Sequence, residues 1–160
     1  MKATRAKVIL GTLLSAAVTV GVAPAAFARS VGAWAGNPIG LTTATRGTCF
    51  SESAGAVTGN FGVSACGNYV WEVNLPVDAS GTYTVYITGS SVSPNPAYVQ
   101  CTAYAVALDG THTNANPVNM TSSVLTNTPL GSVTVPSGGN LFVACFNLQY
   151  GKIGTVNWNQ

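Results

Sequence analysis

The amino-acid sequence predicts an all-β protein, an antiparallel β-sandwich of the jelly-roll or Ig-like kind with about eight strands. Apolar and polar residues alternate with a period of two over most of the chain, as in strands that bury one face. Clusters of Gly, Ser, Pro and Asn separate these segments, and no segment combines helical spacing with helix caps. Four cysteines, an even number, predict that disulfides staple the sandwich.

The N-terminal segment has the parts of a signal peptide. A basic start, MKATRAK, precedes the apolar stretch 8–22, and Pro24 separates this stretch from the small residues AFA. The apolar stretch is shorter than the roughly 20 residues that span a bilayer. We therefore expect cleavage of residues 1–28, leaving 29–160 as a single β-sandwich domain. This domain is expected to be secreted, extracellular or periplasmic, with no membrane span in the mature chain.

The expected mature domain carries few charges. Its basic residues are Arg29, Arg46 and Lys152, and its acidic residues are Glu52, Glu72, Asp78 and Asp109. Three positive and four negative side chains give a formal charge of −1 with the single histidine neutral. Nucleic-acid binding and attachment to anionic membranes both require clustered Lys and Arg, so we expect neither kind of partner. The many Val, Ala, Tyr and Trp residues also argue against disorder.

The four cysteines allow three disulfide connectivities. We expect Cys49–Cys66, which brackets a Gly-rich segment, and Cys101–Cys145, which joins two strong strand candidates. In the chain-entropy model these bridges stabilise the fold by about 3 and about 4 kcal/mol. A metal site is the alternative, but the chain lacks a Cys-x-x-Cys motif and has one histidine. We therefore expect structural disulfides, no metal and no cofactor.

The expected strands follow one another through short turns. In chain order they are 40–46, 56–63, 69–77, 82–88, 98–108, a weak strand at 120–126, 131–136, 141–148 and 153–159. Segment 69–77 alternates Trp71, Val73 and Leu75 on its core-facing side with more polar residues. Pro76 places the end of this segment at a sheet edge or strand terminus. The turn DASG then leads to 82–88, so we expect the two segments to pair as an antiparallel hairpin.

Two groups of residues suggest catalysis. Asp109 and His112 could join one of the serines in a nucleophile–base–orienter set, as in a small hydrolase. The chain has no Gly-x-Ser-x-Gly elbow, however, and Asp109 is the turn residue of an Asp-Gly pair. Glu52 and Glu72 could serve as the two carboxylates of a glycosidase, but nothing in the sequence brings them together across a cleft. We therefore expect a protein that is not an enzyme, with a small hydrolase as the alternative.

The outward side of three strands offers a binding surface. If Trp71, Val85 and Cys101 face the core, then tyrosine, amide and hydroxyl side chains face outward on the same strands. The candidate ligand-binding residues are Asn74, Tyr86, Gln100, Thr102 and Tyr104. Aromatic rings among amides and hydroxyls suit stacking on sugar rings, so we expect a glycan or another cell-surface or matrix component as partner. Tyr and Thr are also good strand formers, so these residues equally fit an ordinary solvated sheet face.

Segment 141–148 suggests a different kind of function. Both of its alternating sides are apolar, as in a strand that is buried on both faces or meets another chain. Together with the low charge, this pattern favours a structural subunit that self-assembles in an extracellular matrix, coat or fibre. The sequon at Asn119 matters only in a host that glycosylates such sites.

Overall fold

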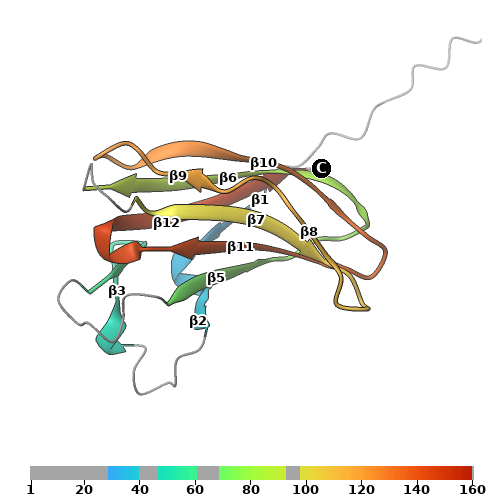
Figure 1. Ribbon diagram of the computed structural model, residues 1–160, viewed down its shortest axis with the longest axis horizontal. Coiled ribbons are helices and arrows are strands. Elements are labelled where there is room, and N and C mark those ends of the chain that lie inside the picture. The colour runs from blue at the N-terminus through green and yellow to red at the C-terminus, as the bar shows by residue number, and fades with distance from the viewer. Residues whose placement is uncertain (1–28, 40–46, 61–68, 93–97, 160) are drawn as a thin grey trace, which may run out of the picture.

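Two antiparallel six-stranded sheets pack face to face as a β-sandwich in the computed structural model (Figure 1). The structure describes residues 29–39, 47–60, 69–92 and 98–159. Every strand pair in these segments is antiparallel. The predicted all-β antiparallel sandwich is therefore confirmed.

One sheet, here called the β6 sheet, has the strand order β10–β6–β12–β4–β3, and β1 also pairs with β12. Its strands are β1 (Arg29–Gly32), β3 (Phe50–Ser53), β4 (Ala56–Gly59), β6 (Gly81–Ser91), β10 (Thr126–Val135) and β12 (Gly151–Asn159). The register of β10 against β6 shifts between Pro129 and Gly131. Pro129 has no amide proton, so it cannot donate a hydrogen bond to β6. The shift in register therefore falls at a position where the β10–β6 pairing already lacks a hydrogen bond.

The other sheet, here called the β7 sheet, has the order β2–β5–β11–β7–β8, and β9 also pairs with β7. Its strands are β2 (Asn37–Ile39), β5 (Val70–Leu75), β7 (Gln100–Val106), β8 (His112–Asn114), β9 (Val118–Asn119) and β11 (Asn140–Phe146). Two short 3-10 helices, η1 (Ala33–Ala35) and η3 (Leu148–Tyr150), lead from β1 to β2 and from β11 to β12. Both helices therefore carry the chain from one sheet to the other.

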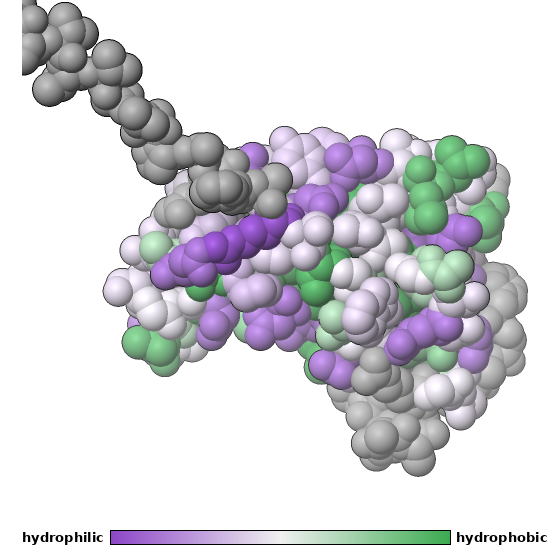
Figure 2. Space-filling model, turned by 180° about the vertical axis from the view of Figure 1, so that it is seen from behind, coloured by the Kyte–Doolittle hydropathy of each residue, from purple (hydrophilic) through white to green (hydrophobic). Residues whose placement is uncertain are grey.

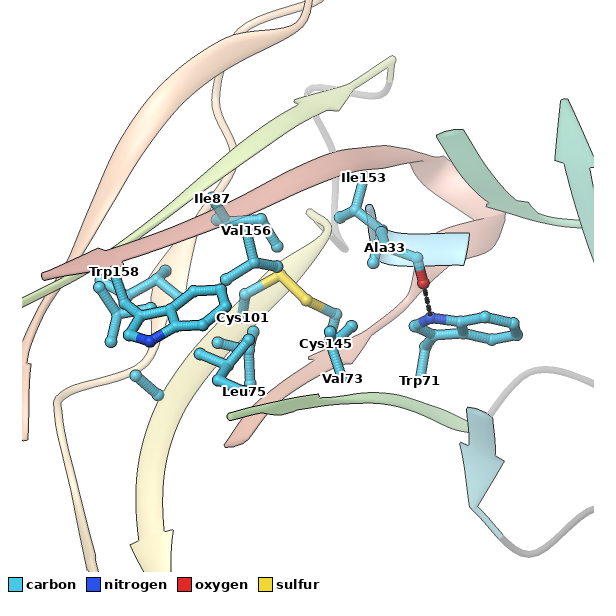
Figure 3. Close-up of a cluster of buried hydrophobic side chains, with 14 of the residues drawn as sticks. Ala33, Trp71, Val73, Leu75, Ile87, Cys101, Cys145, Ile153, Val156 and Trp158 are labelled. Atoms are coloured by element: carbon cyan, nitrogen blue, oxygen red, sulfur yellow. Dashed lines mark hydrogen bonds between the residues drawn. A yellow bond between two sulfur atoms is a disulfide. The ribbon is translucent and has the colours of Figure 1, made fainter. Parts of the chain in front are cut away.

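The hydrophobic core lies between the sheets, where alternate residues of the facing strands meet (Figure 3). β5 buries Trp71, Val73 and Leu75, as the alternation predicts. The indole N–H of Trp71 donates a hydrogen bond of 2.8 Å to the carbonyl of Ala33. The ring of Phe50 lies 4.9 Å from that of Trp71, centroid to centroid. The largest core side chain of β5 is therefore both packed and hydrogen-bonded, as a buried polar group requires.

The Cys101–Cys145 disulfide joins β7 to β11 inside the core (Figure 3). The two cysteines are directly opposite in the register, with their Cα atoms 4.1 Å apart, and both are fully buried. The predicted pairing is confirmed, and the bridge links neighbouring strands of one sheet. Cys66 lies outside the described residues, so the Cys49–Cys66 bridge stays a prediction.

The predicted hairpin between 69–77 and 82–88 is wrong. β5 belongs to the β7 sheet and β6 to the β6 sheet, so residues 76–80 carry the chain across the sandwich. Alternation identifies the side of a strand that faces the core, but it does not identify the neighbouring strand. The apolar sides of β5 and β6 both face the core, but from opposite sheets instead of side by side in one sheet. Pro76 follows the last residue of β5, at a strand terminus as predicted.

Three other expectations about strands are corrected. Segment 120–125 is not a strand but the connection from β9 to β10, in which Met120 is buried, and Thr126 is the first residue of β10. Segment 131–136 is the second part of the longer strand β10. The expected number of about eight strands is too low, because strands such as β2 and β8, with three residues each, are too short to show an alternation. The expected strand at 40–46 lies outside the described residues.

Candidate functional site

Four of the five predicted binding residues lie on the outer face of the β7 sheet. Gln100, Thr102 and Tyr104 are half-buried on this face, because the residues between them in β7 enter the core. Asn74 is exposed on β5. In the register of the sheet, Phe142 of β11 lies between Tyr104 and Asn74. The structure therefore brings these predicted residues together around an aromatic side chain that the prediction did not include.

Tyr104 and Phe142 form a stacked aromatic pair at the centre of this face. Their ring centroids are 5.4 Å apart and their planes meet at 20°. This separation and angle are those of offset stacking, the arrangement that the quadrupoles of two aromatic rings favour. Both side chains are half-buried, so part of each ring remains exposed to solvent. The pair therefore places aromatic rings on the outside of the sandwich.

A hydrogen bond across the sheet holds Tyr104 in place. Its hydroxyl donates to the carboxylate of Glu72 on β5, which lies beyond the intervening strand β11. On β11, the residue opposite Glu72 is Ala144, whose small side chain leaves room for the tyrosine to pass. Burial raises the pKa of Tyr104, and the hydrogen bond to Glu72 and the negative charge of this carboxylate raise it further. Tyr104 therefore stays neutral and keeps donating throughout the neutral pH range.

Amide and hydroxyl groups surround the aromatic pair. The side-chain amide of Gln100 donates a hydrogen bond of 2.9 Å to the side-chain oxygen of Asn119, its register partner on β9. On the other side of Gln100, Phe146 of β11 is 38% exposed. We call this surface the Tyr104 face; it consists of Glu72, Asn74, Gln100, Thr102, Tyr104, Asn119, Phe142 and Phe146. It combines exposed aromatic area with hydrogen-bond donors and acceptors and contains a single charged group.

The fifth predicted residue, Tyr86, lies on the opposite side of the molecule. It belongs to β6 and pairs in register with Pro129 of β10 and Asn157 of β12. Figure 2 looks onto this side, where hydrophilic and near-neutral residues cover most of the described surface. The expectation that Tyr86, Gln100 and Tyr104 share one face is therefore wrong. The error follows from the predicted hairpin, which placed β5 and β6 in one sheet.

Neither suggested catalytic arrangement forms in the described residues. Asp109 accepts hydrogen bonds from the hydroxyl and the amide of Thr111, at 2.7 and 2.9 Å, within the turn after β7. These bonds hold the pKa of the Asp109 carboxyl below its ordinary value. His112 begins β8 and is exposed. Glu52 lies on β3 of the β6 sheet, whereas Glu72 lies on the β7 sheet and binds Tyr104, so these two carboxylates belong to different layers.

The segments that the structure describes contain neither a cluster of metal ligands nor a membrane-spanning helix. In these segments no three His, Cys, Asp or Glu side chains gather as metal ligands would. They also contain no helix with the length and hydrophobicity needed to cross a bilayer.

Sequence reasoning missed the roles of Phe142 and Glu72. Phe142 belongs to segment 141–148, whose two apolar sides favour a self-assembling subunit in the sequence analysis. Phe142, one of the outward residues of this segment, stacks on Tyr104 within the same sheet face, and self-assembly stays a prediction. Glu72 was considered as one of two catalytic carboxylates, whereas it positions a tyrosine. The sequence contained a signal for Glu72, which is the charged residue on the outward side of β5. It contained no such signal for Phe142, because Ala144 and Phe146 make the same side of β11 apolar.

Comparison with solved structures supports the same architecture. The chain superimposes on the C-terminal CBM6 of LamC, a marine laminarinase from Zobellia galactanivorans, with a TM-score of 0.54 and 12% identity, over 84% of this chain and 100% of that one. It also superimposes on the Podospora anserina GH26-CBM35 β-(1,4)-mannanase with a TM-score of 0.51 and 16% identity. That alignment covers 83% of this chain but 28% of the mannanase. No protein-family model and no curated protein matches the sequence. At these identities the similarity shows a shared β-sandwich fold.

Proposed function

We propose that the protein is a non-catalytic, secreted carbohydrate-binding module that holds glycans on the Tyr104 face. The observation that carries this proposal is the stacked Tyr104–Phe142 pair, exposed on a sheet and bordered by the side chains of Asn74, Gln100 and Glu72. The apolar C–H face of a pyranose ring packs well on an aromatic ring. The hydroxyls around its edge then meet amide and carboxylate groups that donate and accept hydrogen bonds.

Tyr104 is better suited to stacking on a sugar ring than a freely rotating tyrosine, because its side chain is already held in place. Its hydroxyl is tied to Glu72, and its ring is fixed against Phe142, so little side-chain entropy is lost when a ligand binds. A carboxylate has about four acceptor positions, so Glu72 can bind Tyr104 and a sugar hydroxyl together. An open face with few hydrogen bonds gives weak binding, with Kd values from micromolar to millimolar, or about −8 to −4 kcal/mol.

The solved structures that share the fold support the class of ligand. The two relatives with TM-scores of 0.54 and 0.51 are named as a carbohydrate-binding module of a laminarinase and as a mannanase that includes one. Laminarin and β-1,4-mannan are therefore the first polysaccharides to test.

The experiment is a broad glycan array, run with affinity electrophoresis in gels that contain laminarin or β-1,4-mannan. The oxidised mature protein is sized at the same concentrations. Retardation in either gel, or a consistent set of array hits, supports the proposal. If no glycan binds at millimolar concentration while gel filtration shows concentration-dependent assembly, the structural-subunit hypothesis replaces it.

A further inference from the structure

Trp34 is the exposed tryptophan of the three in this chain. The other two, Trp71 and Trp158, are core residues with 0% and 2% of their surface exposed, whereas Trp34 is 55% exposed. It lies in η1, where the chain crosses from β1 in the β6 sheet to β2 in the β7 sheet. The Tyr104 face does not include it, so its exposure is not explained by the proposed binding surface.

The backbone that carries Trp34 is fixed on the core side. The preceding residue, Ala33, is fully buried. Its carbonyl accepts a hydrogen bond of 2.8 Å from the indole N–H of Trp71 (Figure 3). The same carbonyl accepts a hydrogen bond of 3.0 Å from the amide of Gly36. A turn held in this way moves little, so the exposed ring is displayed from a rigid base.

The indole of Trp34 packs against the backbone of Gly32. A Cβ atom on Gly32 would lie 2.1 Å from Nε1 and 2.5 Å from Cδ1 of Trp34, which shows that the ring rests against the glycine backbone. Gly32 has φ −68° and ψ 138°, values that any residue adopts, so its backbone conformation does not require glycine. What a glycine permits at this position is the close approach of the ring. The indole is therefore backed by the main chain and remains more than half exposed.

A hollow of about 280 Å³ opens beside Trp34, and the β3–β4 turn forms its other wall. The lining residues of this turn are Glu52, Ser53, Ala54, Gly55 and Ala56. Ala54 has φ 50° and Gly55 has φ 77°, the left-handed pair of a tight hairpin turn. Left-handed backbone costs a residue with a Cβ about 1 kcal/mol or more, which Gly or Asn at position 54 would reduce. The small side chains of Ala54 and Ala56, with Gly55 between them, leave this wall of the hollow shallow.

We infer that this hollow is a second carbohydrate site, distinct from the Tyr104 face, which takes one neutral sugar residue by stacking it on Trp34. The volume is close to the lower end of ligand sites, about 300 Å³, which suits a single ring or a chain end. Glu52 and Ser53 line the same hollow, and a carboxylate and a hydroxyl are groups that accept and donate hydrogen bonds to sugar hydroxyls. Because Glu52 is negatively charged, uronic acids are disfavoured at this site.

Two sites on one module would change how it binds a polymer. Occupation of one site by a polysaccharide raises the local concentration of sugar at the other, so retention on a polymer exceeds that expected from either site alone. The Trp34 site goes beyond the proposed function, because it needs none of the residues of the Tyr104 face.

Tryptophan fluorescence tests this inference directly. In the oxidised mature protein, acrylamide should quench Trp34 selectively, since Trp71 and Trp158 are buried. Laminarihexaose and mannohexaose are the probes, with glucuronic acid as the charged comparison. A bound neutral probe should shift the emission to shorter wavelength and lower the acrylamide quenching constant severalfold. Trp34→Phe supplies the background signal of the two core tryptophans.

Two variants separate this site from the Tyr104 face. Tyr104→Ala should keep the shielding of Trp34 unchanged. Gly32→Ala keeps Trp34 but displaces its ring, so it should weaken the shielding by about tenfold. The far-ultraviolet circular dichroism and Tm of Gly32→Ala should match those of the parent, because its backbone already suits alanine.

Each outcome decides one of the two proposals. If gels retard the protein but no probe shields Trp34, the inference is overturned and the proposed function stands. If Tyr104→Ala abolishes the shielding, Trp34 reports on the Tyr104 face and the second site is overturned. If shielding persists in Tyr104→Ala but the parent and Tyr104→Ala are retarded equally, the Trp34 site stands and the proposal for the Tyr104 face fails. If the gels do not retard the protein and no probe shields Trp34, both the Tyr104 face and the Trp34 site are overturned as glycan-binding sites.

Discussion

Tyr104 on β7 donates a hydrogen bond to Glu72 on β5 across the whole width of the intervening strand β11. The two residues are 32 positions apart in sequence, and their strands, β5 and β7, are not paired with each other in the sheet. The bond crosses the outer face at Ala144 and fixes the tyrosine ring beside Phe142. Tyr104 is therefore the residue on which the proposed binding surface depends most.

Tyr104→Ala should remove retention in polysaccharide gels, with a loss of affinity of at least about tenfold, because the stacked pair and its bond to Glu72 are lost. Tyr86→Ala is the matched control, since Tyr86 is also a half-buried strand tyrosine but lies on the other sheet. Affinity electrophoresis measures both variants beside the parent, and thermal unfolding checks that they fold. Equal loss of retention in the two variants would contradict the assignment of the Tyr104 face.

The hydrogen bond of Tyr104 also predicts how stability changes at alkaline pH. The pKa of Tyr104 is raised above its ordinary value of about 10, first by burial and then by Glu72. A raised pKa means that the stabilisation is complete below pH of about 10 and is lost as the pH rises above it. Tyr104→Phe cannot ionise at this position. The difference in free energy of unfolding between the parent and Tyr104→Phe should therefore shrink from pH 8 to pH 11 in urea titrations. A difference that stays constant over this range would show that neither burial nor Glu72 raises the pKa of Tyr104.

The Cys101–Cys145 bridge should contribute about 4 kcal/mol to stability in the chain-entropy model, because it closes a loop with a sequence separation of 44. Replacing both cysteines by alanine also leaves space in the core, which adds to the loss. The double replacement of Cys49 and Cys66 opens a shorter loop and should cost about 3 kcal/mol. Urea unfolding of both double variants tests this order. A larger loss from the Cys49 and Cys66 variant would contradict it.

The alternation of side chains was sufficient to predict which residues enter the core. Trp71, Val85 and Cys101 are all fully buried, as expected from the period of two in their strands. The same periodicity placed Tyr104 and Gln100 on an outer face. These are local properties of a strand, and the sequence near each residue decides them.

The pairing of strands could not be predicted in this way. β5 and β6 are adjacent in sequence but pair with strands far along the chain, namely β11, β10 and β12. Such pairing depends on how the whole set of strands fills the sandwich, and no single segment contains that information. The misplacement of Tyr86 and the missed Tyr104–Glu72 bond both follow from this limit, because each depends on which strands are neighbours. Trp34 was missed for another reason, since it lies outside any alternating segment.

Export should yield a mature protein that begins at Arg29, as the signal-peptide pattern predicts. In the structure Arg29 starts β1, forms an ion pair with Asp78 and donates a hydrogen bond of 3.3 Å to the carbonyl of Pro76. Both partners lie in the connection between β5 and β6, so the start of the expected mature chain is docked on the sandwich. N-terminal sequencing of secreted protein tests the cleavage site, and thiol titration after unfolding should find no free cysteine. A start beyond Arg29, or two reactive thiols, would contradict the prediction.

Ala144 provides the last test, because it separates the role of the Tyr104–Glu72 bond from the role of the tyrosine itself. Ala144 lies between Glu72 and Thr102 in the register and is 7% exposed, so its small side chain lies beneath the route that Tyr104 takes. Ala144→Val adds two methyl groups on the outer face, where they obstruct this route without entering the core.

We expect this variant to lose the alkaline dependence that Tyr104 confers and to bind glycans about tenfold more weakly, although Tyr104 is still present. The destabilisation should stay within about 1–3 kcal/mol, the usual range for an inserted methyl group, so the domain remains folded. Thr88→Val is the control, since it places a valine at a half-buried position on β6, in the other sheet and outside the Tyr104 face. If Ala144→Val binds glycans as tightly as Thr88→Val and the parent, the geometry of Tyr104 does not determine binding, and the Tyr104 face is not the site.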